Sequence, residues 1–203
     1  MRHAQGAGSA GADRAGTEAG ATAREPAHFR LVADLELRGL TVATGESLTA
    51  GALSSHLAEV PGVSAVLRGG VVAYCNEVKQ SVLAVDAELL RRRGAVDAAV
   101  AAQMAAGAAQ ATGALLGVST TGVAGPEPHQ GKPVGTVFVG VAFAAGVRDL
   151  VQLPPQAVEL TSGNSAESEW ISGAVQLQFT GGRAAVREQS VSRSVLVVQE
   201  MLR

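Results

Sequence analysis

A short strand that leads directly into a helix is the feature that most restricts how this chain can fold. Residues 41–44 form a strand-like run that is mostly β-branched, and Gly45 and Glu46 then end it. From Ser47 to Ala58 the apolar residues recur at helical spacing, and a serine at such a turn is typical of a helix N-cap. We therefore predict a helix that begins at Ser47, in a strand–turn–helix unit of the kind that builds α/β proteins.

The same alternation continues along the chain. Further strands are expected at 71–74 and 115–120, helices at 29–37, 86–93, 97–112 and 183–202, and a hairpin that pairs 135–143 with 147–153. Residues 154–178 are assigned no chemistry, although 175–179 alternates like a strand. Strands separated by helices, followed by a hairpin, predict a single-domain, three-layer α/β/α sandwich with a mixed sheet and with ligands at the carboxyl ends of the strands.

The first residues differ from the rest of the chain. Residues 1–25 hold eight alanines and five glycines without apolar periodicity, so we expect a flexible tail over 1–27 and a folded domain over 28–203. The tail lacks the continuous apolar segment of a secretory signal peptide. The one cysteine, Cys75, cannot form an intramolecular disulfide. Both observations favour a cytoplasmic protein.

Composition argues against several function classes. The formal net charge is −2 and 3% of the residues are aromatic, which disfavours a nucleic-acid partner. The longest apolar stretch, 134–147, is shorter than the roughly 20 residues of a spanning helix, so no membrane span is predicted. The four histidines have no spacing typical of a zinc site or a Ser-His-Asp triad, so no metal is predicted; they are His3, His28, His56 and His129.

Ser47, Lys79 and Tyr74 are the first candidates for chemistry. At its turn the Ser47 hydroxyl would project near helix N–H groups that can stabilise an oxyanion, as a nucleophile requires; the alternative is an N-cap alone. A desolvated Lys79 would lose its proton readily and could accept the serine proton; the alternative is a solvated lysine. Tyr74 could relay that proton or orient Lys79, or stand as an edge-strand aromatic.

Two further segments suit binding. Residues 120–126 supply hydroxyls and then two glycines after the third expected strand, so their N–H groups can bind an anion; the alternative is a tight turn. Arg183 begins the last helix, where its planar guanidinium suits a phosphate; the alternative is a solvated first-turn arginine.

Four ordered motifs carry a resemblance to a known family. They are Glu46-Ser47-x-Thr49, Tyr74-x-Asn76-Glu77-x-Lys79, Thr121-Gly122-x-Ala124-Gly125-Pro126 and Lys132-Pro133-x-Gly135-Thr136. In order and spacing they resemble the CinA C-terminal domain family, whose stand-alone members are nicotinamide-nucleotide amidohydrolases, also called nicotinamide mononucleotide deamidases. The resemblance covers residues 29–153 and 179–202.

The resemblance implies both a reaction and a set of site residues. Nicotinamide mononucleotide and water would give nicotinic acid mononucleotide and ammonia, with no metal or organic cofactor, a small-molecule nucleotide as substrate and a homodimer as the assembly. Ser47 would be the nucleophile, with Tyr74 and Lys79 handling its proton. The implied substrate contacts are Glu46, Thr49, Thr121, Gly122, Gly125 and Arg183. No pyrophosphatase activity is expected, because the domain that supplies it in longer members has no counterpart upstream of Phe29.

Three departures from the family pattern keep other functions open. Leu48 stands where the family usually has cysteine, Ala50 where it has the first of two glycines, and Gly182 where an aspartate is common. The alternatives are a nucleotide-binding module without catalysis and a partner-binding domain associated with competence or DNA repair. The Ala-rich helix at 97–112 offers a smooth surface on which a second subunit could pack.

Overall fold

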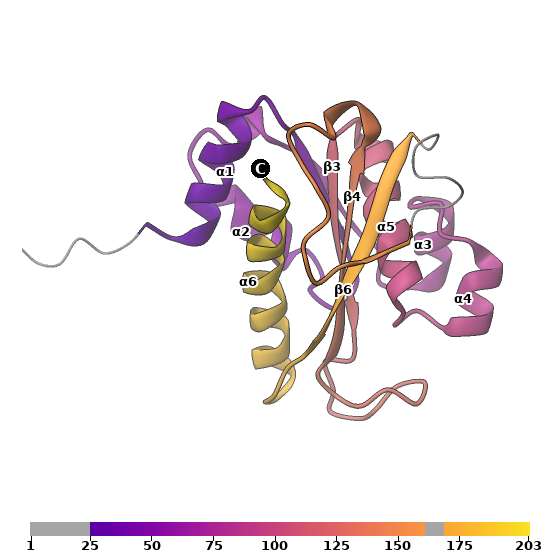
Figure 1. The fold of residues 1–203 in the computed structure, drawn as a ribbon. Coiled ribbons are helices and arrows are strands. Elements are labelled where there is room, and N and C mark those ends of the chain that lie inside the picture. Colours follow the sequence, from indigo (N-terminus) through magenta and orange to yellow (C-terminus); the bar gives the residue numbers. More distant parts are fainter. Residues whose placement is uncertain (1–24, 161–168) are drawn as a thin grey trace, which may run out of the picture.

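The computed structural model describes residues 25–160 and 169–203 and contains a six-stranded mixed sheet (Figure 1). The strand order is β2-β1-β3-β4-β6-β5. β1 lies parallel to β2 and β3, whereas the β3–β4, β4–β6 and β5–β6 pairs are antiparallel. The strands are β1 (Val42–Glu46), β2 (Leu67–Val72), β3 (Leu116–Gly122), β4 (Thr136–Ala144), β5 (Val158–Glu159) and β6 (Trp170–Gln178).

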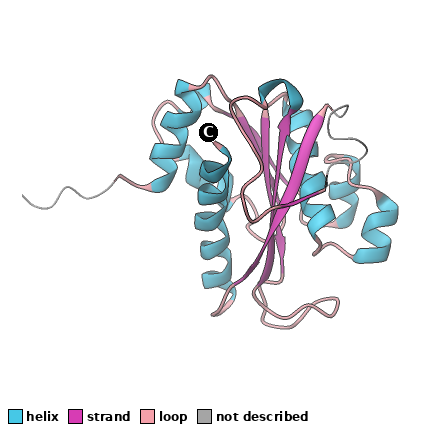
Figure 2. Ribbon diagram, viewed as in Figure 1, coloured by secondary structure: helices cyan, strands magenta, loops and turns pink. Residues whose placement is uncertain are grey.

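Helices cover both faces of the sheet, so the predicted three-layer sandwich is confirmed (Figure 2). One layer contains α1 (Ala27–Leu37), α2 (Ala52–Ala58) and α6 (Arg183–Met201), and the other contains α3 (Asn76–Ser81), α4 (Ala87–Arg93) and α5 (Ala98–Thr112). Short 3₁₀ turns, η1 (Val63–Ala65) and η2 (Ala145–Val147), complete the described elements. Across the described residues, none of the helices has both the length and the apolar character needed to cross a bilayer.

Local sequence explains where several helices begin and end. Asp97 caps α5 by accepting the N–H of Ala99 at 2.8 Å, and Asp86 caps α4 in the same way. Gly113 ends α5 in the left-handed conformation, at φ +68°. These capping residues explain why both helices were predicted to within a residue or two.

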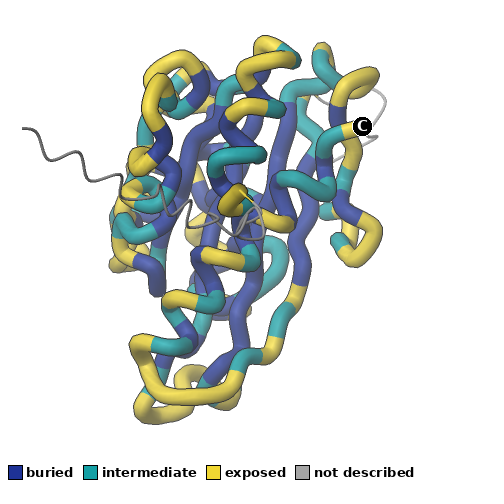
Figure 3. The backbone as a smooth tube through the Cα atoms, turned by 90° about the vertical axis from the view of Figure 1, so that its left-hand side faces the viewer, coloured by how far each residue is buried: buried dark blue, intermediate teal, exposed yellow. Residues whose placement is uncertain are grey.

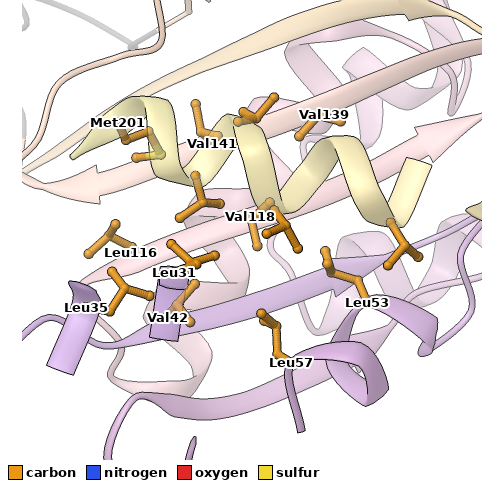
Figure 4. Packing of buried hydrophobic residues seen from close by; sticks show 14 of the residues in the cluster. Leu31, Leu35, Val42, Leu53, Leu57, Leu116, Val118, Val139, Val141 and Met201 are labelled. Carbon is orange, nitrogen blue, oxygen red and sulfur yellow. The ribbon is translucent and has the colours of Figure 1, made fainter. Parts of the chain in front are cut away.

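The larger part of the core lies between the sheet and the α1/α2/α6 layer. Leu31 and Leu35 of α1 pack with Val118 and Val139 of the central strands and Met201 of α6 (Figure 4). Each leucine buried in this way contributes about 1.5–3 kcal/mol relative to an exposed one. Figure 3 shows the result: the central strands are buried along their length, and exposure is concentrated in the outer turns and loops.

The opposite face of the sheet is covered very closely by α5. A Cβ at Gly117 would lie 1.9 Å from the Ala105 carbonyl oxygen, and one at Gly140 would lie 2.1 Å from that of Ala101. α5 can lie this close to the sheet only because Gly117 and Gly140 have a hydrogen atom where other residues have a Cβ. The small residues on this face of α5 therefore pack against this chain's own sheet.

The predicted hairpin of 135–143 with 147–153 is wrong. β4 pairs with β6 over nine residues, from Thr136↔Gln178 to Ala144↔Trp170. The 147–153 segment instead approaches the end of α6, where Val151 forms a bridge with Leu202. Two prolines follow this segment, and proline has no N–H to donate to a neighbouring strand. β6 contains no proline, so every one of its residues has a backbone N–H.

Candidate active site

A cleft of about 450 Å³ lies at the carboxyl ends of the parallel strands. Its walls come from the turn after β1, the segment after β2, the loop after β3 and the start of α6, and residues 95–96 complete it. The residues from the four elements are Ser47 and Leu48; Tyr74, Asn76 and Lys79; 121–130; and Arg183. The fold therefore joins segments that lie far apart in the sequence, at the edge where α/β sheets bind ligands.

Ser47 and Lys79 are in direct contact within this cleft. The Lys79 Nζ donates to the Ser47 Oγ at 3.1 Å and to the Ala73 carbonyl oxygen at 2.7 Å. Only 1% of Lys79 is exposed, because α3 turns its side chain under the cleft floor. Burial lowers the pKa of Lys79, against the opposite influence of Cys75 and Glu77. A lysine that loses its proton more easily than a free lysine can act as a general base towards a neighbouring serine hydroxyl.

The N-cap interpretation of Ser47 is wrong. α2 begins at Ala52 with Gly51, at φ +93°, as its cap residue. The Ser47 N–H instead extends the β1–β3 ladder by donating to the Thr120 carbonyl oxygen at 2.9 Å. The Ser47 hydroxyl is therefore not used for capping, and it faces Lys79.

The Glu46 carboxylate does the capping that was expected of Ser47. It accepts N–H groups from Gly51, Leu53 and Ser54 at 2.8–3.0 Å, together with the hydroxyls of Thr44, Thr49 and Ser54. Burial alone raises the pKa of Glu46, but the hydrogen bonds from Ser54, Thr49 and Leu53 together lower it below its usual value. Glu46 and Thr49, expected as substrate contacts, are fully buried and line no part of the cleft, so the structure places them as supports of the turn.

The capping arrangement also changes where an oxyanion could be stabilised. The first N–H groups of α2 are directed at Glu46 and are not available to a substrate. Leu48, which follows Ser47 and lines the cleft, has no acceptor for its N–H among the described residues. Its N–H is the free donor nearest to Ser47 in sequence, and backbone N–H groups in such turns are typical oxyanion donors.

Arg183 joins two sides of the cleft mouth. Its guanidinium donates to the Tyr74 hydroxyl at 2.7 Å and to the Gly125 carbonyl oxygen at 3.2 Å. Tyr74 is 56% exposed, and among the described residues its hydroxyl bonds to Arg183 rather than to Ser47 or Lys79. The structure thus places Tyr74 in the lining of the cleft, hydrogen-bonded to Arg183.

The end of β3 and the loop that follows it form another wall of the cleft. Thr121 is 1% exposed and donates its hydroxyl to the Ala95 carbonyl oxygen at 2.7 Å. Gly122 and Gly125 both line the cleft, and Gly125 has a φ of +88° that favours glycine. All three predicted residues therefore lie where a ligand in the cleft would meet them.

Sequence reasoning missed Arg187 as a support of the turn that carries Ser47. Its Nε donates to the Leu48 carbonyl oxygen at 3.0 Å and its Nη2 donates to that of Thr49 at 2.8 Å. The available signal was its spacing from Arg183, since residues four apart share one face of a helix. Asn76 and His129 also line the cleft without having been assigned a role.

Within residues 25–160 and 169–203, one group of possible metal ligands forms outside the cleft. His28, His56 and Glu59 meet between α1 and α2, with one ligand atom of each within 4.8 Å of the others. The sequence predicted no metal site, because His28 and His56 are 28 positions apart.

The fold and the cleft define an α/β protein with a serine–lysine site at the carboxyl edge of a mixed sheet. The family model for the CinA C-terminal domain matches residues 25–155, and the chain belongs to this family. The resemblance drawn from the four motifs is thereby confirmed.

Relatives and solved structures agree with this membership. A CinA-like protein of Frankia casuarinae is 51% identical over 58% of this chain and 27% of its own length. A putative competence-damage inducible protein of Bacillus pumilus is 38% identical over 75% of this chain and 31% of its own length, so the chain matches under a third of either relative. The CinA superfamily structure from Klebsiella pneumoniae 700603 has a TM-score of 0.70 and 28% identity, covering 86% of this chain and 94% of that one.

Proposed function

We propose that the protein is a serine amidohydrolase that converts nicotinamide mononucleotide and water to nicotinic acid mononucleotide and ammonia. The observation that carries the proposal is the 3.1 Å contact between the Ser47 Oγ and the buried Lys79 Nζ. Burial lowers the pKa of Lys79, so this amine loses its proton more easily than a free lysine and can serve as the base.

The proposed reaction has two stages. Neutral Lys79 accepts the Ser47 proton while the Oγ attacks the carboxamide carbon, and the Leu48 N–H donates to the oxyanion that forms. The C–N bond then breaks, and Lys79 returns the proton to the departing ammonia. A water molecule then gives a proton to Lys79 and attacks the resulting ester. The ester C–O bond breaks, the carboxylic acid leaves, and Lys79 returns the proton to the Ser47 Oγ.

The rest of the cleft suits a nucleotide. Its volume of about 450 Å³ falls within the range of small-molecule sites, roughly 300–1,000 Å³. Arg183 has five N–H donors and uses some of them on Tyr74 and Gly125, so others can bind a phosphate. Binding energy from the phosphate, remote from the reacting carbon, would hold the carboxamide against Ser47.

The first test replaces the nucleophile. Ser47→Ala should keep its fold and its affinity for nicotinamide mononucleotide but lose turnover by about 10³-fold or more. Release of ammonia and nicotinic acid mononucleotide from the purified protein measures this. Ser64→Ala removes an exposed serine of η1 and should leave the rate unchanged. Equal rates for Ser47→Ala and the wild type would rule out covalent catalysis by Ser47.

A nucleotide-binding module without turnover is the second candidate, and one observation favours it. Ala50, in the turn that carries Ser47, has a φ of +52°, which costs an alanine free energy where a glycine would adopt it freely. Calorimetry that shows tight binding of nicotinamide mononucleotide to wild-type protein, with no product formed, would support this function instead.

A further inference from the structure

Two of the histidines that the sequence left without partners, His28 and His56, meet between α1 and α2. His28 lies near the start of α1, His56 lies in the last turn of α2, and Glu59 is the residue that ends α2. His56 and Glu59 are three positions apart and so share one helix face. The packing of α1 against α2 brings His28 onto that face, with the two imidazole centroids 3.8 Å apart.

The distances within this cluster suit a metal ion. The Glu59 Oε2 lies 3.3 Å from the His28 Nε2 and 3.3 Å from the His56 Nδ1. Ligands held 2.0–2.1 Å from a tetrahedral ion are about 3.3 Å from one another. Two of the three ligand–ligand distances thus already match a tetrahedral centre, and all three ligand atoms lie within 4.8 Å of one another.

Among the described residues, a buried nitrogen of the cluster has an ion-pair contact but no hydrogen bond. The His28 side chain is 8% exposed, and its Nε2 forms no hydrogen bond within the described chain, although the Glu59 carboxylate is near. A buried polar atom without a hydrogen bond is unfavourable, so native structures rarely keep one. The nitrogen lies within 4.8 Å of the other two ligand atoms, and a bound cation would satisfy it.

We propose that His28, His56 and Glu59 bind one divalent cation of the zinc type between α1 and α2, separately from the amidase cleft. Two imidazole nitrogens and one carboxylate oxygen are a donor set that zinc commonly takes, with a fourth position left for water. His56 and Glu59 also border a second cleft of about 480 Å³ between α2 and α6, through which an ion can reach them. The ion ties the start of α1 to the end of α2.

The test titrates Zn²⁺ alone into the full chain, purified in the presence of a chelator and then freed of it, by calorimetry. One ion per chain is expected to bind, and His56→Gln and Glu59→Gln should each weaken its affinity at least tenfold. Zn²⁺ should raise the melting temperature of the wild type and should not raise that of either variant. Glu36→Gln, which changes an exposed glutamate of α1, is the matched control and should behave like the wild type.

His56→Gln and Glu59→Gln are better test variants than a replacement of His28. His28 is buried and its replacement can disturb folding, whereas the His56 and Glu59 side chains are 30% and 58% exposed. Co²⁺ should give a ligand-field spectrum without a thiolate charge-transfer band, which separates this site from one that uses Cys75. The proposal is overturned if no Zn²⁺ binds at millimolar concentration, or if His56→Gln and Glu59→Gln bind it as tightly as the wild type does.

Discussion

Lys79 has a long basic side chain, yet it is almost completely buried, and burial disfavours its charged form. Two oxygens, the Ser47 Oγ and the Ala73 carbonyl, lie within hydrogen-bond distance of its Nζ. The sequence predicted Ser47 and Lys79 as a candidate pair because each follows a strand. It could not show that they touch, since their contact depends on how α3 folds under the turn.

The lowered pKa of Lys79 predicts a pH dependence for the proposed amidase activity. The base is active when neutral, so kcat/KM should rise as pH increases through the lowered pKa of Lys79 and then level off. Initial rates of ammonia release across pH 6–10, with the Ser47→Ala background subtracted, measure it. Lys132 is the other lysine of the chain, and Lys132→Gln should keep the same inflection. A rate that falls with pH would contradict a lysine base.

Glu46 illustrates a role that spacing could not reveal. Glu46→Gln should destabilise the fold by about 2–4 kcal/mol, because it removes a buried charge that accepts several N–H and O–H groups. The folded-state pKa of Glu46 is lowered, so its stabilisation is present above the unfolded pKa and is lost as pH falls through the folded value. Urea unfolding at pH 7 and at acid pH measures both effects. Exposed Glu188, changed to Gln, is the control and should shift stability by under about 0.5 kcal/mol.

Among the elements, helices were easier to predict than strand pairs. Asp86 and Asp97 specify helix starts through local hydrogen bonds, and the sequence shows them directly. The predicted partner of β4 was wrong. β6 is separated from β4 by a long connection, and no local sequence pattern indicates that the two strands pair. α3 was missed as a helix, since six residues give too little periodicity to detect.

The turn between β1 and α2 contains a strained residue that can be relieved. Ala50→Gly should stabilise the protein by about 0.5–1 kcal/mol, because glycine adopts the observed φ of +52° without the steric cost to a Cβ. Urea denaturation measures the change. The same replacement at Ala58, in ordinary α2 conformation, should destabilise by about 0.5–1 kcal/mol. A loss of stability in Ala50→Gly would show that the turn carries no strain at this position.

At the scale of the whole molecule, the layered architecture followed from the alternation of strands and helices, but the closeness of the layers did not. In the sequence, Gly117 and Gly140 are simply glycines within apolar strands. Their role appears only when α5 is placed over the sheet, with its carbonyl oxygens in the space that a Cβ would need. Spacing between layers is a property of the assembled fold, and no local pattern encodes it.

This close packing makes a quantitative prediction. Gly117→Ala should destabilise the protein by about 2–3 kcal/mol or more, because the added methyl group would overlap the Ala105 backbone and push α5 away from β3. Thermal unfolding should show a melting temperature lower by several degrees. Gly146→Ala adds the same methyl group where no atom lies within 4 Å, and its melting temperature should stay near that of the wild type. Equal effects at the two positions would contradict the packing argument.

Arg183 and Arg187 of α6 have a consequence for the order in which the protein matures. Arg183 bridges the cleft mouth and Arg187 holds the Leu48 and Thr49 carbonyls, yet both belong to the helix that follows every strand of the sheet. A ribosome therefore releases Ser47 and Lys79 well before the groups that fix the turn around them. During synthesis the nascent chain holds an unfinished site, and the proposed reactivity towards amides would arrive only when α6 docks.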